Sequence, residues 1–169
     1  MTLAIAAAAL VLSAGALAAR AIGPFGWVVA ASGGIVALAV PLGYSFEIRR
    51  RAWLMATGAG VLAVVSVRLL APLPMSATRW GLAAAVMTGV AEEAIFRRGL
   101  YGLLVRWGPA VAIVSSAGAF ALVHIPVYGW RVLPLNIAAG LVFGWQRWAG
   151  GHWSSPAATH ALANALAHI

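Results

Sequence analysis

Long apolar runs alternate along this chain with short segments that are rich in arginine, proline or glycine. A helix that crosses a bilayer needs about 20 mostly apolar residues. Runs of about this kind cover residues 3–19, 27–45, 52–71, 80–96, 109–126, 132–149 and 153–168. The pattern therefore predicts an all-α polytopic membrane protein with about seven transmembrane helices, in the range of roughly six to eight.

Proline and glycine mark the ends of the C-terminal runs. Pro109 suits the first turn of a helix, where no backbone N–H donor is needed. We expect this helix to stop at Pro126, because a proline ring disrupts a helix interior. Gly150 with Gly151 is expected to end the next helix. Residues 99–107 are expected to form a bent or interfacial extension of the run before Pro109.

No linker, low-complexity tract or repeat divides the chain, so residues 1–169 are predicted to form a single membrane domain. N-terminal helices occupy residues 1–79, and a C-terminal core occupies residues 80–169. Most of the polar side chains with catalytic chemistry belong to this core. We therefore expect a helical bundle whose polar site lies between its C-terminal helices.

The composition makes lipid the expected solvent for most of the surface. Hydrophobic residues make up 63% of the chain and charged residues 8%, whereas about a quarter of a soluble domain is charged. All 11 basic residues are arginines, and the net charge is +8. They lie mostly between the apolar runs and form no basic stripe. The expected partner is therefore a bilayer with anionic headgroups, and nucleic acid is not expected.

The arginines also predict an orientation in the membrane. If alternate loops face the same side, one side receives more arginines, and the positive-inside rule places that side in the cytosol. The richer set is Arg49, Arg50, Arg51, Arg98, Arg106 and Arg147, and the other set is Arg20, Arg79 and Arg131. We expect a multi-pass cell-membrane protein with a cytosolic N-terminus. The absence of lysine among many alanines, glycines and arginines favours a bacterial inner membrane.

Two missing residue types limit the chemistry. Without cysteine there is no thiol nucleophile and no thiolate metal site. Without aspartate, the paired aspartates of an aspartyl protease are excluded. The three acids are Glu47, in a predicted loop, and the adjacent Glu92 and Glu93 in an apolar run. A charged side chain inside a membrane helix costs about 2.5–3.5 kcal/mol, so the adjacent glutamates are the first functional candidates.

Helical geometry gives the two glutamates different surroundings. Glu93 precedes Arg97 by four residues, which places both side chains on one helix face and predicts an ion pair. Glu92 points about 140° away from Arg97, at about 100° per residue. We expect Glu93 to be held by the arginine and Glu92 to stay free to act as a general base. The alternative is a carboxylate pair that Arg97 and Arg98 only neutralise.

Two histidines lie in later apolar runs. His124 follows Phe120 by four residues and His160 precedes Asn164 by four, so each pair shares a helix face. Either histidine alone would more often be a hydrogen-bonded core residue, but both together with a glutamate pair indicate a site. Counting along straight helices places Glu92 and His160 at similar depth and His124 about 10 Å away from them.

These residues fall into three motifs. Residues 92–97 (EEAIFR) fit EExxxR, residues 120–124 (FALVH) fit FxxxH, and residues 160–164 (HALAN) fit HxxxN. In this order and spacing, the motifs resemble the CPBP family (CAAX protease and bacteriocin-processing, also called Abi), which includes the Ras-converting CAAX endopeptidase. The resemblance covers approximately residues 80–168. Arg98, which follows the first motif, is a local departure from the commoner Phe-Arg-Gly sequence of the family.

The resemblance implies a glutamate-dependent intramembrane protease. It implies that Glu92 and His124 activate a water that attacks the scissile carbonyl. It also implies that His160 and Asn164 stabilise the oxyanion. The supporting residues would be Glu93, Arg97 and Phe120.

Zinc is the main alternative for the chemistry. Glu92, His124 and His160 could together form a His₂Glu zinc site. The HExxH helix of many zinc proteases is missing, however, and so is a further carboxylate ligand. We therefore expect no metal and no other cofactor.

The resemblance also implies a substrate with a hydrophobic or lipidated tail at the membrane. Candidates are a prenylated CAAX protein, a bacteriocin precursor and a C-terminal sorting tail, as in the myxosortase-like branch. CAAX proteins are not expected in a bacterium, which favours peptide maturation or tail removal. Two other classes stay open, namely a non-enzymatic bacteriocin self-immunity or scaffold protein and a small proton-coupled transporter.

Overall fold

The computed structural model describes residues 48–70 and 79–167, and every regular element in these segments is helical. The predicted all-α class is therefore confirmed for the described part of the chain. Two described helices are long and apolar enough to cross a membrane, Arg50–Leu70 and Pro109–Pro126. The first two predicted runs lie outside the described residues, so the total of about seven transmembrane helices stays a prediction.

The helical elements begin and end close to the predicted runs. In chain order they are α3 (Arg50–Leu70), α4 (Arg79–Glu93), the π-helix η1 (Ala94–Leu100), α5 (Tyr101–Leu104), the 3₁₀-helix η2 (Val105–Trp107), α6 (Pro109–Tyr128), the 3₁₀-helix η3 (Trp130–Val132), α7 (Leu133–Gly150) and α8 (Ser154–Leu166). The extension expected before Pro109 is the stretch through α5 and η2, where the helix type changes twice.

One predicted helix end is wrong. α6 does not stop at Pro126 but continues to Tyr128. A proline ring removes one backbone hydrogen bond from a helix, and here the loss falls in the last turn, where Pro126 is exposed. The helix ends instead at Gly129, which has a φ of 79° that favours glycine. The N–H of Gly129 donates to the carbonyl of Ile125 at 2.7 Å.

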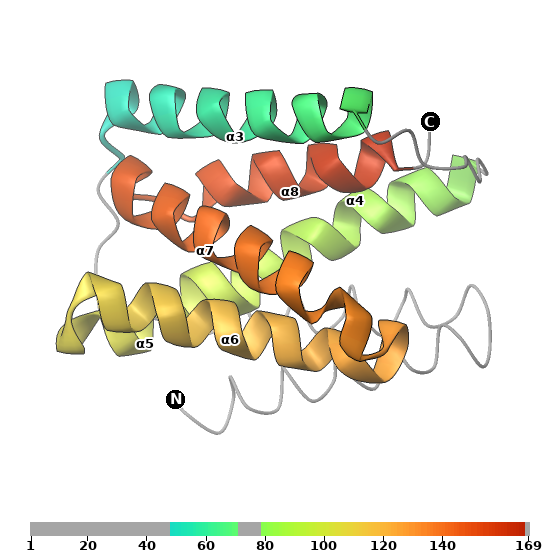
Figure 1. Ribbon diagram of the computed structural model, residues 1–169. Helices are drawn as coiled ribbons and strands as arrows, with labels where there is room; N and C mark the ends of the chain where they lie inside the picture. The colour runs from blue at the N-terminus through green and yellow to red at the C-terminus, as the bar shows by residue number, and fades with distance from the viewer. Residues whose placement is uncertain (1–47, 71–78, 168–169) are drawn as a thin grey trace.

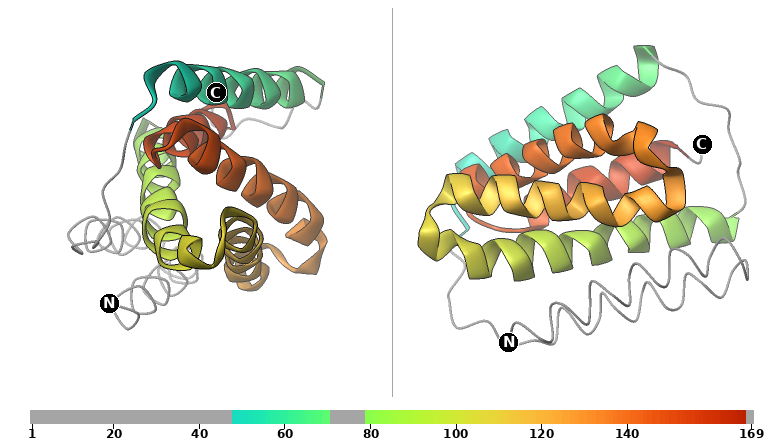
Figure 2. Two further views of the ribbon diagram at one scale, coloured as in Figure 1. Left: turned by 90° about the vertical axis from the view of Figure 1, so that its left-hand side faces the viewer. Right: turned by 60° about the horizontal axis from the view of Figure 1, so that its bottom comes forward.

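The helices pack into a bundle in which α8 lies between α4 and α7 (Figure 1). α4 packs along α8, α6 packs along α7, and α3 lies across both α7 and α8. In Figure 2, α4, α6, α7 and α8 surround a common interior, with α3 outside α7 and α8. The three helices that carry the motifs, α4, α6 and α8, therefore border the same interior.

The interior contains close helix contacts and an aromatic core. A Cβ at Gly140 would lie 2.8 Å from the Cα of Ala117, so α7 crosses α6 this closely only because residue 140 lacks a side chain. The rings of Phe96 and Phe120 meet edge to face with centroids 5.5 Å apart. Both phenylalanines are buried, and Phe120 is the first residue of the FxxxH motif.

α3 has two different faces. Ala56 and Gly60 are buried against the bundle. Its large exposed apolar side chains are Leu54, Met55, Leu62, Val67, Leu69 and Leu70. A helix that turns so many large apolar groups outward matches a lipid environment rather than water.

Candidate active site

The two glutamates lie where the backbone changes from one helix type to another. Glu92 and Glu93 end α4, and the next seven residues, Ala94–Leu100, form a π-helix. π-turns within helices are frequent at functional sites. The first four residues of this π-helix are buried, so the turn lies inside the bundle.

Glu93 and Arg97 form the ion pair that their spacing predicts. Arg97 Nη1 donates to Glu93 Oε1 at 2.9 Å, and both side chains are 0% exposed. Arg97 Nη2 donates to the carbonyl oxygen of Gly140 at 3.1 Å. The guanidinium carbon lies 4.7 Å from the ring centroid of Phe120 and 5.3 Å from that of Phe143. These contacts offset part of the cost of burying the arginine charge.

His160 is held by the same carboxylate. Its Nδ1 lies 2.9 Å from Glu93 Oε1, and the residue is buried. A carboxylate that is paired with an arginine accepts hydrogen bonds, so Nδ1 of His160 carries a proton. The other ring nitrogen, Nε2, lies 3.6 Å from Glu92 Oε2. Glu93 therefore orients the His160 ring toward Glu92.

His124 is oriented by the backbone of its own helix. Its Nδ1 donates to the carbonyl oxygen of Phe120 at 2.7 Å, and because a carbonyl only accepts, this nitrogen carries the proton. The ring also stacks on Tyr128, with ring planes 15° apart and centroids 5.9 Å apart. The remaining nitrogen, Nε2, lies 3.8 Å from Glu92 Oε2.

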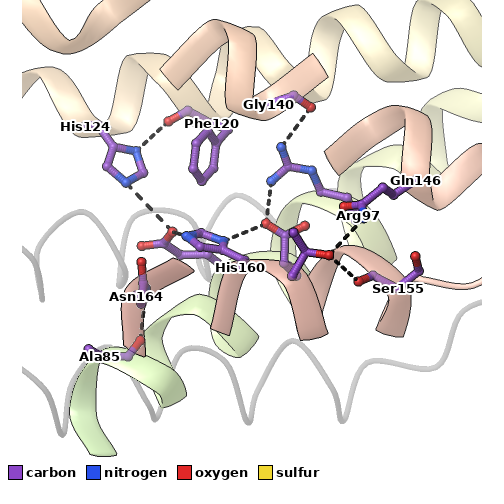
Figure 3. A network of polar contacts seen from close by, with 12 residues as sticks. Ala85, Arg97, Phe120, His124, Gly140, Gln146, Ser155, His160 and Asn164 are labelled. Atoms are coloured by element: carbon purple, nitrogen blue, oxygen red, sulfur yellow. Dashed lines mark hydrogen bonds and ion pairs between the residues drawn. The ribbon is translucent and has the colours of Figure 1, made fainter. Parts of the chain in front are cut away.

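Three polar atoms from three different helices, α4, α6 and α8, therefore lie close together. They are Oε2 of Glu92 and the Nε2 atoms of His124 and His160. Figure 3 shows the two histidines on facing helices with the Phe120 ring beside them. Both distances from Glu92 are longer than a hydrogen bond, which is the spacing at which a small molecule such as water can bridge two polar groups.

The depth expected for His124 is wrong. Straight-helix counting separates it from Glu92 by about 10 Å, whereas the two side chains approach to 3.8 Å. The count assumes that all helices begin at the same level. In Figure 1, α5 and the start of α6 project beyond the left-hand ends of α3 and α7, so α6 does not begin level with its neighbours. A residue of α6 therefore lies closer to that end of the bundle than counting from a common level gives.

Asn164 lies one turn beyond His160 on α8, beside α4. Its Nδ2 donates to the carbonyl oxygen of Ala85 at 2.9 Å. An asparagine amide has two N–H donors, so this hydrogen bond leaves one donor for a ligand. Figure 3 shows Asn164 and His160 on the same helix, with Ala85 on the helix opposite.

Gly89 is a contributor that the motifs do not include. A Cβ at this position would lie 3.1 Å from Asn164 Nδ2 and 3.3 Å from the backbone of His160. Gly89 therefore lets α4 approach α8 at the level of both residues. Its signal in the sequence is weak, since it is one of 19 glycines.

Gly89→Ala is expected to lower peptide-bond cleavage more than it lowers stability, because the new methyl group displaces α8 at His160 and Asn164. Gly118→Ala is the matched control, since it is a helical glycine whose Cβ would meet nothing within 4 Å. It should keep activity and gain up to about 1 kcal/mol of stability. The measurements are kcat and thermal unfolding in one detergent. Equal activity of the two variants would remove Gly89 from the site.

His152, for which the sequence predicts no role, lies between α7 and α8. Its Nδ1 is 2.7 Å from Ser154 Oγ and accepts the backbone N–H of Ser154 at 3.2 Å. Burial lowers the pKa of His152, and the nearby charges of Arg147 and Arg98 lower it further. A neutral His152 is thus an acceptor at the start of the helix that carries His160.

The residues that would hold a metal are the three at the centre of the site. Glu92, His124 and His160 offer a carboxylate and two imidazole nitrogens, which are zinc ligand types. Within residues 48–70 and 79–167, however, no group of three or more His, Cys, Asp or Glu side chains is arranged to hold a metal ion.

Comparison with known families identifies the family of the chain. Residues 74–166 match the family described as type II CAAX prenyl endopeptidase Rce1-like. The match spans more than half of the 169 residues and contains all three motifs. The chain therefore belongs to the Rce1-like family, and it is a membrane protein and a protease. The predicted CAAX protease family is confirmed, while the myxosortase-like branch stays a prediction. No curated protein and no solved structure gave a match.

Proposed function

We propose that this protein is an intramembrane endopeptidase that cuts near the C-terminus, or in a hydrophobic tail, of a membrane-associated substrate. The observation that carries the proposal is the meeting of Glu92 with the Nε2 atoms of His124 and His160 inside a helical bundle. A carboxylate and an imidazole nitrogen at this spacing can hold a water molecule and remove its proton.

The two histidines have different partners, and this supports different roles for them. Nδ1 of His124 faces a neutral backbone carbonyl, which leaves Nε2 as the acceptor that orients a water. Nδ1 of His160 faces the Glu93 carboxylate instead of a carbonyl, the arrangement in which an imidazole can donate hydrogen bonds from both ring nitrogens during catalysis. We propose that Nε2 of His160 is such a donor when the oxyanion forms. We therefore assign His124 to the water and His160 to the oxyanion.

The proposed reaction needs no covalent intermediate. Glu92 takes a proton from the water, and the resulting hydroxide attacks the scissile carbonyl carbon. The negative charge on the carbonyl oxygen is stabilised by Nε2–H of His160 and by the second amide N–H of Asn164. Glu92 then returns the proton to the leaving amine as the peptide bond breaks.

The family and the membrane character of the chain support three candidate substrates. The family is named for prenylated CAAX substrates, so a prenylated C-terminal peptide is the first substrate to test. A leader-bearing bacteriocin precursor and a C-terminal sorting tail are the second and third. They share a scissile bond next to a hydrophobic segment that lipid can hold beside the site.

The bundle has a basic end, which we propose faces the cytosol. The starts of α3 and α6, α5 and the end of α7 lie at this end (Figure 1). Arg50 and Arg51 are exposed there, and Arg106 lies 3.9 Å from the ring centroid of Trp107. An arginine packed on an exposed tryptophan matches the headgroup level of a membrane, and the excess of arginines indicates the cytosolic side.

The test is cleavage by the purified full chain in liposomes of each of the three peptides, with the product identified by mass spectrometry. A product that ends at one defined bond, made by the wild type and not by His124→Ala, supports the proposal. If no peptide is cut, or if His124→Ala cuts as fast as the wild type, the proposed mechanism is wrong. In the first case the scaffold, self-immunity and transporter hypotheses take its place, and in the second a protease with other catalytic residues does.

Removal of metal ions is expected to leave kcat unchanged, because Glu92 and His124 activate the water directly in the proposed reaction. The measurement compares cleavage before and after treatment with a zinc chelator, with the zinc content of the protein determined in parallel. Loss of activity on chelation, restored by added zinc, would make Glu92, His124 and His160 metal ligands and contradict this prediction.

A further inference from the structure

We infer that Gln146 and Arg147, two consecutive residues of α7, are positioning residues for the site; the inference rests on the proposed function. Neither residue belongs to the three motifs. Gln146 is 0% exposed and Arg147 is 7% exposed. Polar side chains this deep in an apolar bundle are costly unless they make hydrogen bonds. Gln146 has a partner on α8, next to His160, and Arg147 has a partner on η1, close to Glu92 and Glu93.

Gln146 connects α7 to the residue before His160. Its Nε2 donates to Thr159 Oγ1 at 2.8 Å and to the carbonyl oxygen of Ala56 at 2.8 Å. Thr159 Oγ1 in turn donates to the carbonyl oxygen of Ser155 at 3.4 Å. One amide group thus joins α3, α7 and α8 directly beside the histidine that orients toward Glu92.

α3 is shaped to accept this amide. A Cβ at Gly60 would collide with Nε2 of Gln146 and lie 2.7 Å from Oγ1 of Thr159, so only glycine leaves room for this hydrogen bond. α3 lies outside the family match, which begins at residue 74. A helix beyond the matched residues therefore helps to hold the catalytic core.

Arg147 connects α7 to η1, the π-helix that follows the two glutamates. Its Nε donates to the carbonyl oxygen of Arg97 at 3.2 Å, and its guanidinium carbon lies 4.9 Å from the ring centroid of Tyr101. Arg97 belongs to the π-helix that directly follows Glu92 and Glu93. Consecutive side chains on a helix point about 100° apart, so Gln146 can reach α8 while Arg147 reaches η1.

Together the two residues fix the distance between Glu92 and His160. Gln146 holds α8 and Arg147 holds η1, and both are attached to one rigid helix. A small displacement at a catalytic centre lowers kcat strongly, because the reacting groups lose alignment while substrate binding is retained. The two side chains therefore act through Glu92 and His160 and need not contact the substrate.

The test uses a matched pair at Thr159. Thr159→Val has the same shape but cannot accept the hydrogen bond of Gln146, whereas Thr159→Ser keeps the hydroxyl group. Thr159→Val and Gln146→Met are expected to lower kcat about tenfold or more with KM little changed. Thr159→Ser should stay close to the wild type. Trp145→Phe, at the exposed neighbour on α7, is the control for unspecific effects.

A second readout does not depend on cleavage. The chain has four histidines, so ring ¹⁵N NMR signals of the labelled protein can be assigned by single substitutions. Gln146→Met and Thr159→Val are expected to shift or broaden the ring signals of His160, and Thr159→Ser is expected to leave them in place. Unchanged His160 signals, or unchanged kcat in an active protein, would overturn the inference. A wild type that cuts no peptide would instead refute the proposed function.

Discussion

Glu92→Gln is expected to lower kcat about 10³-fold, within the roughly 10²–10⁴-fold range of general acid–base catalysis, and to leave the fold intact. Glutamine has nearly the same shape as glutamate but cannot take a proton from water. The amide would still face the Nε2 atoms of His124 and His160, which lie 3.8 and 3.6 Å from Oε2 in the wild type. The measurement is kcat with a peptide that the wild type cleaves. The thermal unfolding temperature is measured alongside and should equal that of the wild type.

A second variant at this position separates charge from placement. Glu92→Asp keeps the carboxylate but withdraws it by one methylene, and a misplacement of about 1 Å costs on the order of 10²-fold in kcat. Glu92→Asp should therefore be more active than Glu92→Gln. If glutamine retained most of the wild-type kcat, Glu92 would not be the base.

Arg97→Met is expected to destabilise the protein by about 3–5 kcal/mol, which is the usual cost of breaking a buried ion pair. The substitution leaves the Glu93 carboxylate fully buried without its cation, and Glu93 Oε2 already has no hydrogen-bond partner. It also removes the donor to the carbonyl of Gly140. The free energy of unfolding in detergent or lipid is the quantity to measure.

The double substitution Glu93→Gln with Arg97→Met should recover part of this loss, because it removes both charges instead of one. Arg131→Met is the control at an exposed arginine, and its effect should stay within about 0.5 kcal/mol. A single Arg97→Met that is as stable as Arg131→Met would show that the Glu93–Arg97 pair does not hold the site together.

The part of the site that sequence predicts correctly depends on local geometry. The Glu93–Arg97 pair follows from a spacing of four residues, and even the π-helix that begins at Ala94 does not break it. The helices that carry His124 and His160 also follow from hydrophobic runs, and for the first of them Gly108, Pro109 and Gly129 mark the ends. Such features depend on neighbours in the chain, so one sequence is enough to find them.

The features that sequence misses depend on contacts between distant segments. The approach of His124 to Glu92 depends on where α6 begins relative to α4, which counting along each helix cannot give. The hydrogen bond from Gln146 to Ala56 joins residues 90 positions apart. An isolated glutamine in an apolar run gives no sign of such a partner. The roles of Gly60 and Gly89 are likewise visible only when the helices are packed together.

The most direct test is an experimental structure in lipid, at a resolution that shows ordered waters. The proposed mechanism predicts one water within about 2.6–3.2 Å of Glu92 Oε2 and His124 Nε2, with His160 Nε2 beside it. Anomalous scattering at the zinc edge should show no metal at this position. A zinc ion bound by Glu92, His124 and His160, or a Glu92 carboxylate turned away from both histidines, would contradict it.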